Sequence, residues 1–248
     1  MFDIGIDLGT SAVKLLLVSD AGTVQRTVSR SYSLEFPQPG WSQQNPEDWW
    51  NAILDGIPEL IAGINPEKIG GIGVAGQMHG LVALDRDGNV LRPAILWNDG
   101  RTAEETEYLN SEIGKDFLLR HTGNIAFAGF TAPKLLWMKK HEPELFGRIA
   151  RILLPKDYVG YKLTGRYTTD YSDGAGTLLL NVQNKRWSKE MLEICGLTED
   201  QMPELHESYE IAGTLLPKVA EQLGLPASVT VVAGAGDNAA AAVGTGCL

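Results

Sequence analysis

Residues 2–19 have the sequence FDIGIDLGTSAVKLLLVS, and this stretch decides the fold. Two short, apolar, β-prone runs, 2–8 and 13–18, stand on either side of a Gly-Thr-Ser turn, and this pattern predicts a β-hairpin. A second turn precedes residues 23–32, where polar and apolar residues alternate loosely, so we expect three consecutive antiparallel strands. A dinucleotide-binding fold would pass from its first strand through a glycine-rich turn directly into a helix. The hairpin therefore argues against that fold.

The rest of the chain alternates between strand-like and helix-like segments. Asn45 is a capping residue and Pro46 suits the first helical position, so a helix is predicted to about residue 62. Strands are predicted at 69–74, at 81–84 paired with 90–91, and at 229–233. Further helices are predicted at 102–113, 131–140, 143–149, 156–163, 188–195, 217–223 and 239–243. Loop-like composition at 170–176 and 201–208 indicates that the region after about residue 100 elaborates a mixed sheet flanked by helices, in an α/β fold.

The chain is acidic and otherwise of ordinary globular composition. Its 248 residues include 21 Lys+Arg and 31 Asp+Glu, a formal net charge of −10, and 28 glycines, which favour tight turns and close backbone approaches. An acidic surface repels nucleic acids and anionic membranes, and no basic patch stands out, so small molecules are the expected partners. With two cysteines, no apolar leader and no long apolar run, we expect a protein of the reducing cytoplasm without a membrane span.

The first candidate site is Asp7-Leu8-Gly9-Thr10-Ser11, where an acidic residue at a strand end is followed by a turn. Backbone amides and hydroxyls in such a turn can hold phosphate oxygens, and Lys14 lies just beyond it. A carboxylate at this position can hold Mg²⁺ together with water and substrate phosphates. Asp and Gly are also ordinary residues of a hairpin turn, so a purely structural interpretation stays open.

The second candidate site combines two polar clusters, Gly76-Gln77-Met78-His79-Gly80 and Trp97-Asn98-Asp99-Gly100-Arg101, each of which follows an apolar run. Amide, imidazole and carboxylate groups supply the donors and acceptors that polyol hydroxyls need, and an aromatic face can cover the C–H surface of a sugar. The alternative is that His79 is a buried structural histidine and that Asp99 caps the following helix.

The third candidate site is Gly234-Ala235-Gly236-Asp237-Asn238, between the last predicted strand and an alanine-rich helix. A carboxylate at the carboxyl edge of a sheet lies where α/β ligand sites form, and it can accept a proton from an attacking hydroxyl. Asp237 as a simple helix cap is the alternative that the residues leave open.

Together these motifs resemble the FGGY carbohydrate kinases, and among them the xylulokinases most closely. Asp7–Ser11 is similar to the family's phosphate loop, Gly76–Gly80 to the sugar motif of the xylulokinases, and Gly236–Asn238 to the catalytic-base motif. Residues 93–101, 129–137 and 153–158 resemble further family segments in the same order, so the resemblance spans essentially all of the chain. It implies an actin-like, ribonuclease H-like domain.

The resemblance implies ATP-dependent transfer of a phosphoryl group to the 5-hydroxyl of D-xylulose. Asp237 would be the catalytic base and Asp7 would help to place Mg²⁺. The nucleotide phosphates would lie against Asp7, Gly9, Thr10, Ser11 and Lys14. The sugar would contact Met78, His79 and Asn238, with Gln77, Trp97, Asp99 and Arg101 as further candidates. The alternatives are another FGGY kinase, for ribulose, gluconate or another polyol, and a non-catalytic sugar-binding module.

The family's kinases are about twice as long as this chain, with a second domain that brings most of the nucleotide pocket. We therefore interpret residues 1–248 as an N-terminal sugar-binding domain without its C-terminal nucleotide-binding partner, and expect little or no kinase activity from the 248 residues alone. The expected partners are D-xylulose or a related ketose, and ATP shared with the second domain. Nucleic acid and membrane are excluded as partners, and a homodimer is left open.

Overall fold

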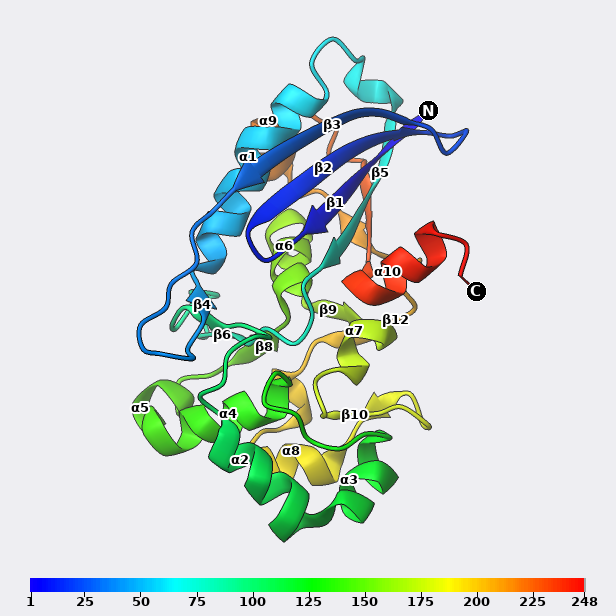
Figure 1. The fold of residues 1–248 in the computed structure, drawn as a ribbon. Coiled ribbons are helices and arrows are strands. Elements are labelled where there is room, and N and C mark those ends of the chain that lie inside the picture. Colours follow the sequence, from blue (N-terminus) through cyan, green and yellow to red (C-terminus); the bar gives the residue numbers. More distant parts are fainter. Residues whose placement is uncertain (248) are drawn as a thin grey trace.

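One mixed sheet forms the upper half of the molecule in Figure 1, which shows a computed structural model that describes residues 1–247. Its strands are β1 (Phe2–Leu8), β2 (Ala12–Ser19), β3 (Val24–Ser31), β5 (Ile69–Gly76), β13 (Ile211–Thr214), β14 (Thr230–Val232) and β15 (Ala235–Gly236). They lie in the order β13-β14-β5-β1-β2-β3, and β15 extends the line of β14 beside β5. The pairs β1–β2 and β2–β3 are antiparallel, whereas β5 is parallel to β1, β14 and β15, so the three leading antiparallel strands and the mixed sheet are confirmed.

The sheet buries one face against helices because its strands alternate between apolar and smaller or polar residues. Ile4, Ile6 and Leu8 of β1 are almost fully buried on that face. The face is covered by α1 (Pro46–Leu60), α6 (Pro155–Thr164) and α9 (Pro217–Leu223), which share one hydrophobic core with it (Figure 1). The last helix, α10 (Asp237–Gly244), borders the opposite face, where Gly5, Leu16 and other small or apolar residues lie.

Helix α1 begins where the sequence places it. The side chain of Asn45 accepts a hydrogen bond from the Glu47 backbone N–H at 3.2 Å, and Pro46 occupies the first helical position. Trp49 and Ile53 are fully buried one turn apart, which orients the helix on the sheet. The helix ends at Leu60, two residues before the predicted end.

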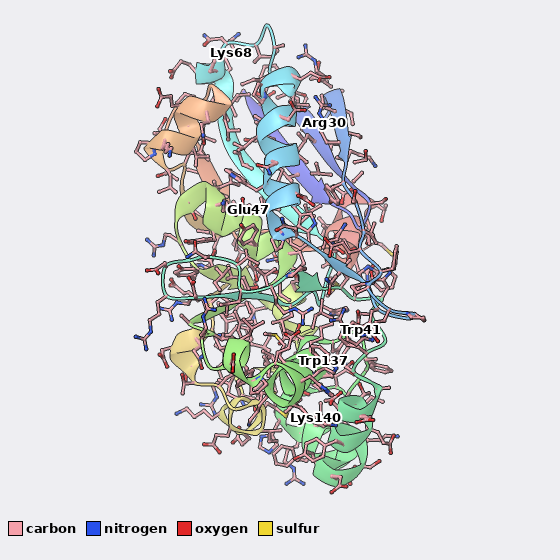
Figure 2. All side chains as sticks on the ribbon, turned by 90° about the vertical axis from the view of Figure 1, so that its left-hand side faces the viewer. Arg30, Trp41, Glu47, Lys68, Trp137 and Lys140 are labelled. Carbon is pink, nitrogen blue, oxygen red and sulfur yellow. The ribbon has the colours of Figure 1, made fainter. Side chains whose placement is uncertain are left out.

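A second hydrophobic core holds the lower half together. Its helices and helical turns are α2 (Ala103–Tyr108), a π-helical segment (Leu109–Gly114), α3 (Lys115–Thr122), α4 (Thr131–His141), α5 (Pro143–Phe146), α7 (Tyr171–Ala175), α8 (Lys189–Cys195) and a 3₁₀ turn (Glu199–Gln201), and a further 3₁₀ turn (Pro66–Lys68) precedes β5. Its short strands are β4 (Gln43–Gln44), β6 (Val82–Leu84), β7 (Ala94–Ile95), β8 (Arg151–Leu153), β9 (Thr168–Asp170), β10 (Leu180–Asn181), β11 (Arg186–Trp187) and β12 (Glu204–His206). Trp41 and Trp137 pack edge to face at 5.3 Å at the side of this core (Figure 2).

The helices of the described residues are short, and α1 is the longest with 15 residues. Within residues 1–247 the structure forms no helix with both the length and the apolar character that crossing a bilayer needs. Cys195 is buried in the second core and Cys247 is exposed, and both are free thiols.

The structure corrects several expectations. Residues 171–175 form helix α7 rather than a loop, because the side chain of Asp170 caps the Ser172 and Asp173 backbone N–H groups. The predicted loop 201–208 contains β12, which pairs with β9. The helix predicted over 102–113 becomes π-helical from residue 109, and the one predicted over 143–149 ends at Phe146. Helix α3 and strands β8, β9 and β13 had no clear signal in the sequence.

Candidate active site

The turn after β1 is built as a rigid backbone loop. The Gly9 N–H donates to the carbonyls of Asp7 and Ala12 at 3.2 and 3.0 Å. The Tyr32 hydroxyl donates to the Gly9 carbonyl at 2.5 Å, and the Gln44 amide donates to the Thr10 carbonyl at 2.8 Å. The Gly9 N–H is used within the turn and Thr10 Oγ1 accepts from Trp97 Nε1, whereas the Thr10 and Ser11 backbone N–H groups donate to no other described residue and stay available for a ligand.

Asp7 and Lys14 stand opposite one another at this turn. They are register partners on β1 and β2, so their side chains share the face of the sheet that is not covered by α1. Asp7 is half-buried and Lys14 is exposed. Among residues 1–247, nothing donates a hydrogen bond or pairs as an ion with the Asp7 carboxylate, which leaves its oxygens free for a cation or a phosphate-bound water.

Gln77 lies beneath the turn rather than in the open. Its side chain is almost completely buried, and its amide N–H₂ donates to Gln44 Oε1 at 3.1 Å and lies 3.5 Å from the Gly9 carbonyl. Trp49 Nε1 donates to the same Gln44 oxygen at 3.1 Å. The Gln77 amide nitrogen supports the turn, whereas its Oε1 accepts no hydrogen bond among the described residues, and the predicted sugar contact of Gln77 stays a prediction.

Asp237 lies at the same end of the sheet as Asp7, where the parallel strands β1, β5 and β15 have their carboxyl ends. Asp7 and Ala235 are both register partners of Ala75 on β5, so two strand spacings, about 10 Å, separate their backbones. Asp237 follows two residues later as the first residue of α10, and the cap position itself is held by Gly236. Burial, and in addition the negative charge of Asp7, raises the pKa of Asp237 above its ordinary value.

The segment before Asp237 requires a glycine. Gly234 has φ +78°, and a Cβ atom placed on it would lie 2.0 Å from the Val74 carbonyl oxygen. Any side chain would push the segment away from β5. The Gly234-Ala235-Gly236 spacing therefore allows the chain to pass close to the sheet before it turns into α10.

His79 is held from several directions. Its backbone has φ +68°, and its carbonyl accepts hydrogen bonds from Lys134 Nζ at 2.7 Å and Thr131 Oγ1 at 3.2 Å. Its Nδ1 lies 2.9 Å from the Gly176 carbonyl, and the Phe130 ring is 4.7 Å away. A carbonyl can only accept, so Nδ1 carries the hydrogen and Nε2 is left as an acceptor.

Met78 connects the Gly76–Gly80 motif to the segment around Asp237. Its sulfur lies 4.0 Å from Asn238 Nδ2, and a Cβ atom on Gly236 would come within 3.0 Å of the same sulfur. Met78 is half-buried and Asn238 is exposed. The structure thus brings Met78, His79, Asp237 and Asn238, which are far apart in the sequence, to one place beside the Asp7 turn.

Residues 97–101 divide into an exposed and an enclosed part. The Trp97 side chain is half exposed, and its Nε1 donates to Thr10 Oγ1 at 3.0 Å. Asp99 and Arg101 form an ion pair at 2.8 Å with fully buried side chains, and the Arg101 guanidinium lies 4.0 Å over the Trp41 ring. Trp97 therefore borders the turn, whereas Asp99 and Arg101 stiffen the loop behind it. Asp99 also does not cap α2, which begins after Thr102 without a side-chain cap.

A buried ionic cluster that the sequence did not indicate lies beside residues 233–236, which precede Asp237. Lys156 Nζ lies 2.6 Å from Asp157 Oδ1 and 3.0 Å from Asp170 Oδ1, and all three side chains are fully buried. Asp173 is also fully buried, and burial raises its pKa well above the ordinary value. Lys156 and Asp157 belong to a segment that the resemblance covers, but no spacing in the sequence indicates that Asp170 and Asp173 would join them.

Lys134 is a further buried residue that the sequence did not indicate. Its side chain is fully buried, and besides the His79 carbonyl it donates to the Gly129 carbonyl at 2.6 Å. Burial lowers the pKa of Lys134 to about 7. A lysine in the middle of a mixed apolar and polar helix gives no signal of such a role in the sequence.

A Mg²⁺ ion fits the Asp7 turn by the chemistry of its donors. Within residues 1–247 no group of three or more His, Cys, Asp or Glu side chains forms a ready-made metal site. Mg²⁺ does not require one, since it usually keeps several waters and shares one or two carboxylates with substrate phosphates. The free Asp7 carboxylate beside a turn with available amides offers that arrangement.

We expect His79 to stay neutral across the physiological pH range. Burial, with the nearby Lys134 charge, lowers the pKa of His79 to about 4, so the ring with hydrogen on Nδ1 persists at about pH 5 and above. The ¹⁵N chemical shifts of the ring, assigned with a His79→Gln variant, measure this directly. Protonation of the ring near the ordinary pKa of about 6.5 would contradict the expectation.

Comparison with known proteins shows which family shares this sequence and this fold. Residues 2–244 match the family model described as "FGGY family of carbohydrate kinases, N-terminal domain". The chain is 49% identical over 245 residues to the "Xylulose kinase" of Escherichia coli (strain K12), covering 99% of this chain and 50% of that protein. The solved structure of a "xyloylose kinase" from Brucella ovis superposes with a TM-score of 0.93 at 46% identity, covering 98% of this chain and 50% of that one.

A gluconate kinase from Lactobacillus acidophilus superposes almost as well, with a TM-score of 0.91 at 28% identity over 95% of this chain and 48% of that one. The chain spans about half the length of the curated relatives it matches. These likenesses agree with the mixed sheet and flanking helices, and they confirm the actin-like, ribonuclease H-like α/β fold. The chain therefore belongs to the FGGY family of carbohydrate kinases, in the region that corresponds to the family's N-terminal domain.

Proposed function

We propose that the protein containing this chain phosphorylates D-xylulose at its 5-hydroxyl with ATP, and that residues 1–248 supply the sugar site and the catalytic base. The observation that carries the proposal is the placement of Asp7 and Asp237 at one sheet edge, with Met78 and His79 beside them. The likeness to proteins named xylulose kinase supports the substrate class.

In this proposal Asp237 orients the sugar hydroxyl and accepts its proton. The half-buried carboxylate suits that role because its raised pKa makes it a better proton acceptor. His79 Nε2 accepts a hydrogen bond from a sugar hydroxyl, and Asn238 supplies a further amide. Met78 and the exposed ring of Trp97 cover apolar surface of the sugar.

In this proposal the Asp7 turn binds the phosphate groups of the nucleotide. The backbone amides and hydroxyls of Thr10 and Ser11, with the charge of Lys14, would face the transferred phosphoryl group. Asp7 would hold Mg²⁺, which would neutralise developing charge on the phosphate oxygens. The remainder of the nucleotide site is assigned to the second half of the protein, since the relatives are about twice as long.

A hollow elsewhere in the structure does not compete with this site. It has a volume of about 960 Å³ and is lined by Glu47, Trp50 and Lys162 among others, on the side of α1 and α6 that Figure 2 faces. None of the predicted site residues lines it. Two of its ionic groups pair with each other, since Lys162 Nζ lies 2.8 Å from Glu47 Oε1.

A substrate panel on the full-length protein tests the proposal. With ATP and Mg²⁺, we expect kcat/KM for D-xylulose to exceed that for D-ribulose, D-gluconate and glycerol by at least about tenfold, because a site built to bond specific hydroxyls discriminates against sugars that leave its groups unpaired. An enzyme-coupled assay of ADP release measures this. Preference for gluconate would make the protein a different FGGY kinase, and sugar binding without turnover of any substrate would favour a non-catalytic module.

A further inference from the structure

The four residues before Asp237 are tied to the rest of the protein by a set of hydrogen bonds from outside the sheet. The Ala233 N–H donates to the Glu210 carbonyl at 2.9 Å, and the Gly234 N–H donates to the Ser208 carbonyl at 3.0 Å. Lys156 Nζ lies 3.3 Å from the Ala233 carbonyl. These contacts fix where the segment starts, because they join it both to the loop between β12 and β13 and to α6.

The contact closest to Asp237 comes from a side chain. The Gly236 N–H donates to Ser172 Oγ at 3.1 Å, one peptide unit before Asp237. Ser172 lies in the first turn of α7, and its own hydroxyl hydrogen goes to Asp170 Oδ2 at 2.5 Å. The Ser172 hydroxyl thus bridges a buried carboxylate and the Ala235–Gly236 peptide, which directly precedes the peptide that carries the proposed base.

Asp170 is itself fixed by charge. Its Oδ2 accepts the Ser172 and Ser208 hydroxyls at 2.5 and 2.8 Å, and its Oδ1 pairs with buried Lys156 at 3.0 Å. Burial alone would raise the pKa of Asp170, but Lys156 and the two hydroxyls outweigh it and hold the pKa below its ordinary value. The carboxylate therefore stays ionised and keeps both hydroxyls oriented as donors to it.

We propose that Ser172 is a positioning residue for catalysis, which fixes Asp237 through the Gly236 N–H while the buried Lys156–Asp170 pair fixes Ser172. The proposal rests on the function proposed above, in which Asp237 is the base. General-base catalysis depends on sub-ångström placement of the carboxylate relative to the hydroxyl, so a segment held at its last peptide unit acts mainly on the chemical step. Among residues 1–247, neither Met78 nor His79 bonds to the Ser172 hydroxyl, so these two proposed sugar contacts are independent of the bridge, whereas Asn238 moves with Asp237 and accounts for a small change in KM.

The structure offers a matched pair of variants in the full-length protein. Ser172→Ala and Ser208→Ala each remove one hydroxyl from Asp170 Oδ2, but only the Ser172 hydroxyl contacts the base segment. We expect Ser172→Ala to lower kcat by about five- to tenfold with the sugar KM changed less than about twofold, as the loss of one hydrogen bond would do. Ser208→Ala should leave kcat within about twofold, and both variants should lose similar thermal stability.

Ser172→Thr retains the bridging hydroxyl and provides the rescue, so its kcat should return to at least about half of the wild-type value. Equal losses of kcat in the two alanine variants, a loss confined to KM, or no recovery with threonine would overturn the proposal. Failure of the proposed function has a different signature, since an Asp237→Asn variant would then retain its kcat whatever the serine variants do.

Discussion

Replacement of Asp237 by Asn is expected to lower kcat of the full-length protein by about 10³-fold while the dissociation constant for D-xylulose changes by less than about threefold. Asn has nearly the shape of Asp and still receives the Asn238 N–H, which contacts Asp237 Oδ1 at 2.8 Å, but it cannot accept the proton of the attacking hydroxyl. Coupled assay of ADP release measures the rate, and calorimetric titration measures the sugar affinity.

Asp116→Asn is the control, since Asp116 is exposed on α3 and belongs to the second half of the fold. Its kcat should stay at the wild-type value.

The pH dependence of kcat gives an independent check. A base must be ionised, so kcat falls as the pH drops through the pKa of the base. The raised pKa of Asp237 places that fall above the ordinary aspartate value of about 3.9. A variant Asp237→Asn with more than about a tenth of wild-type turnover would remove Asp237 from the role of base.

Replacement of Lys156 by Met is expected to destabilise the fold by about 3–5 kcal/mol, because it leaves Asp157 and Asp170 buried without their cation. Burial would lower the pKa of Lys156, but the surrounding carboxylates outweigh it and raise that pKa, so the ammonium group is charged at every pH of interest. Urea denaturation followed by circular dichroism measures the free energy of unfolding.

Lys162→Met on the same helix is the control. Lys162 pairs with Glu47 in a partly exposed ion pair, so its loss should cost at most about 1 kcal/mol.

The pH dependence of the free energy of unfolding has a definite sign. A carboxyl whose pKa is lower in the folded protein, such as Asp170, stabilises the fold above its unfolded pKa of about 3.9, and this contribution disappears as the pH falls through the folded pKa. The deficit of Lys156→Met should therefore shrink in acid, and equal losses for the two lysine variants would contradict a structural role for the buried cluster.

The sheet could be predicted from the sequence because its signals are local. The alternation in residues 2–8, the turn at 9–11 and the apolar run 13–18 determine a hairpin within 17 residues, and β1–β2 pairing follows that register throughout. Helix α1 was equally accessible through Asn45 and Pro46. Helix α7 was not, because its composition is that of a loop and its start depends on the cap from Asp170, whose orientation is set by a distant lysine.

The sequence could predict which residues gather at the candidate site, but not which of their side chains are exposed to a ligand and which are buried. Asp7 lies at the end of a strand that the sequence indicates, His79 and Asp237 follow two others, and the fold brings these strand ends together. Whether a side chain such as Gln77 or Arg101 faces a ligand or the interior depends on burial, which no motif reports. Both are enclosed here and support the turn and the neighbouring loop, and their predicted sugar contacts stay predictions.

The two hydrophobic cores hold different parts of the candidate site. The Asp7 turn rests on the sheet and its core, whereas His79 is held by Phe130, Thr131 and Lys134 from the helical half. The Asp237 segment depends on both halves, because β15 pairs with β5 and the Gly236 N–H donates to Ser172 of α7. A substitution in the lower half that moves α7 therefore displaces the Asp237 segment while the Asp7 turn keeps its place.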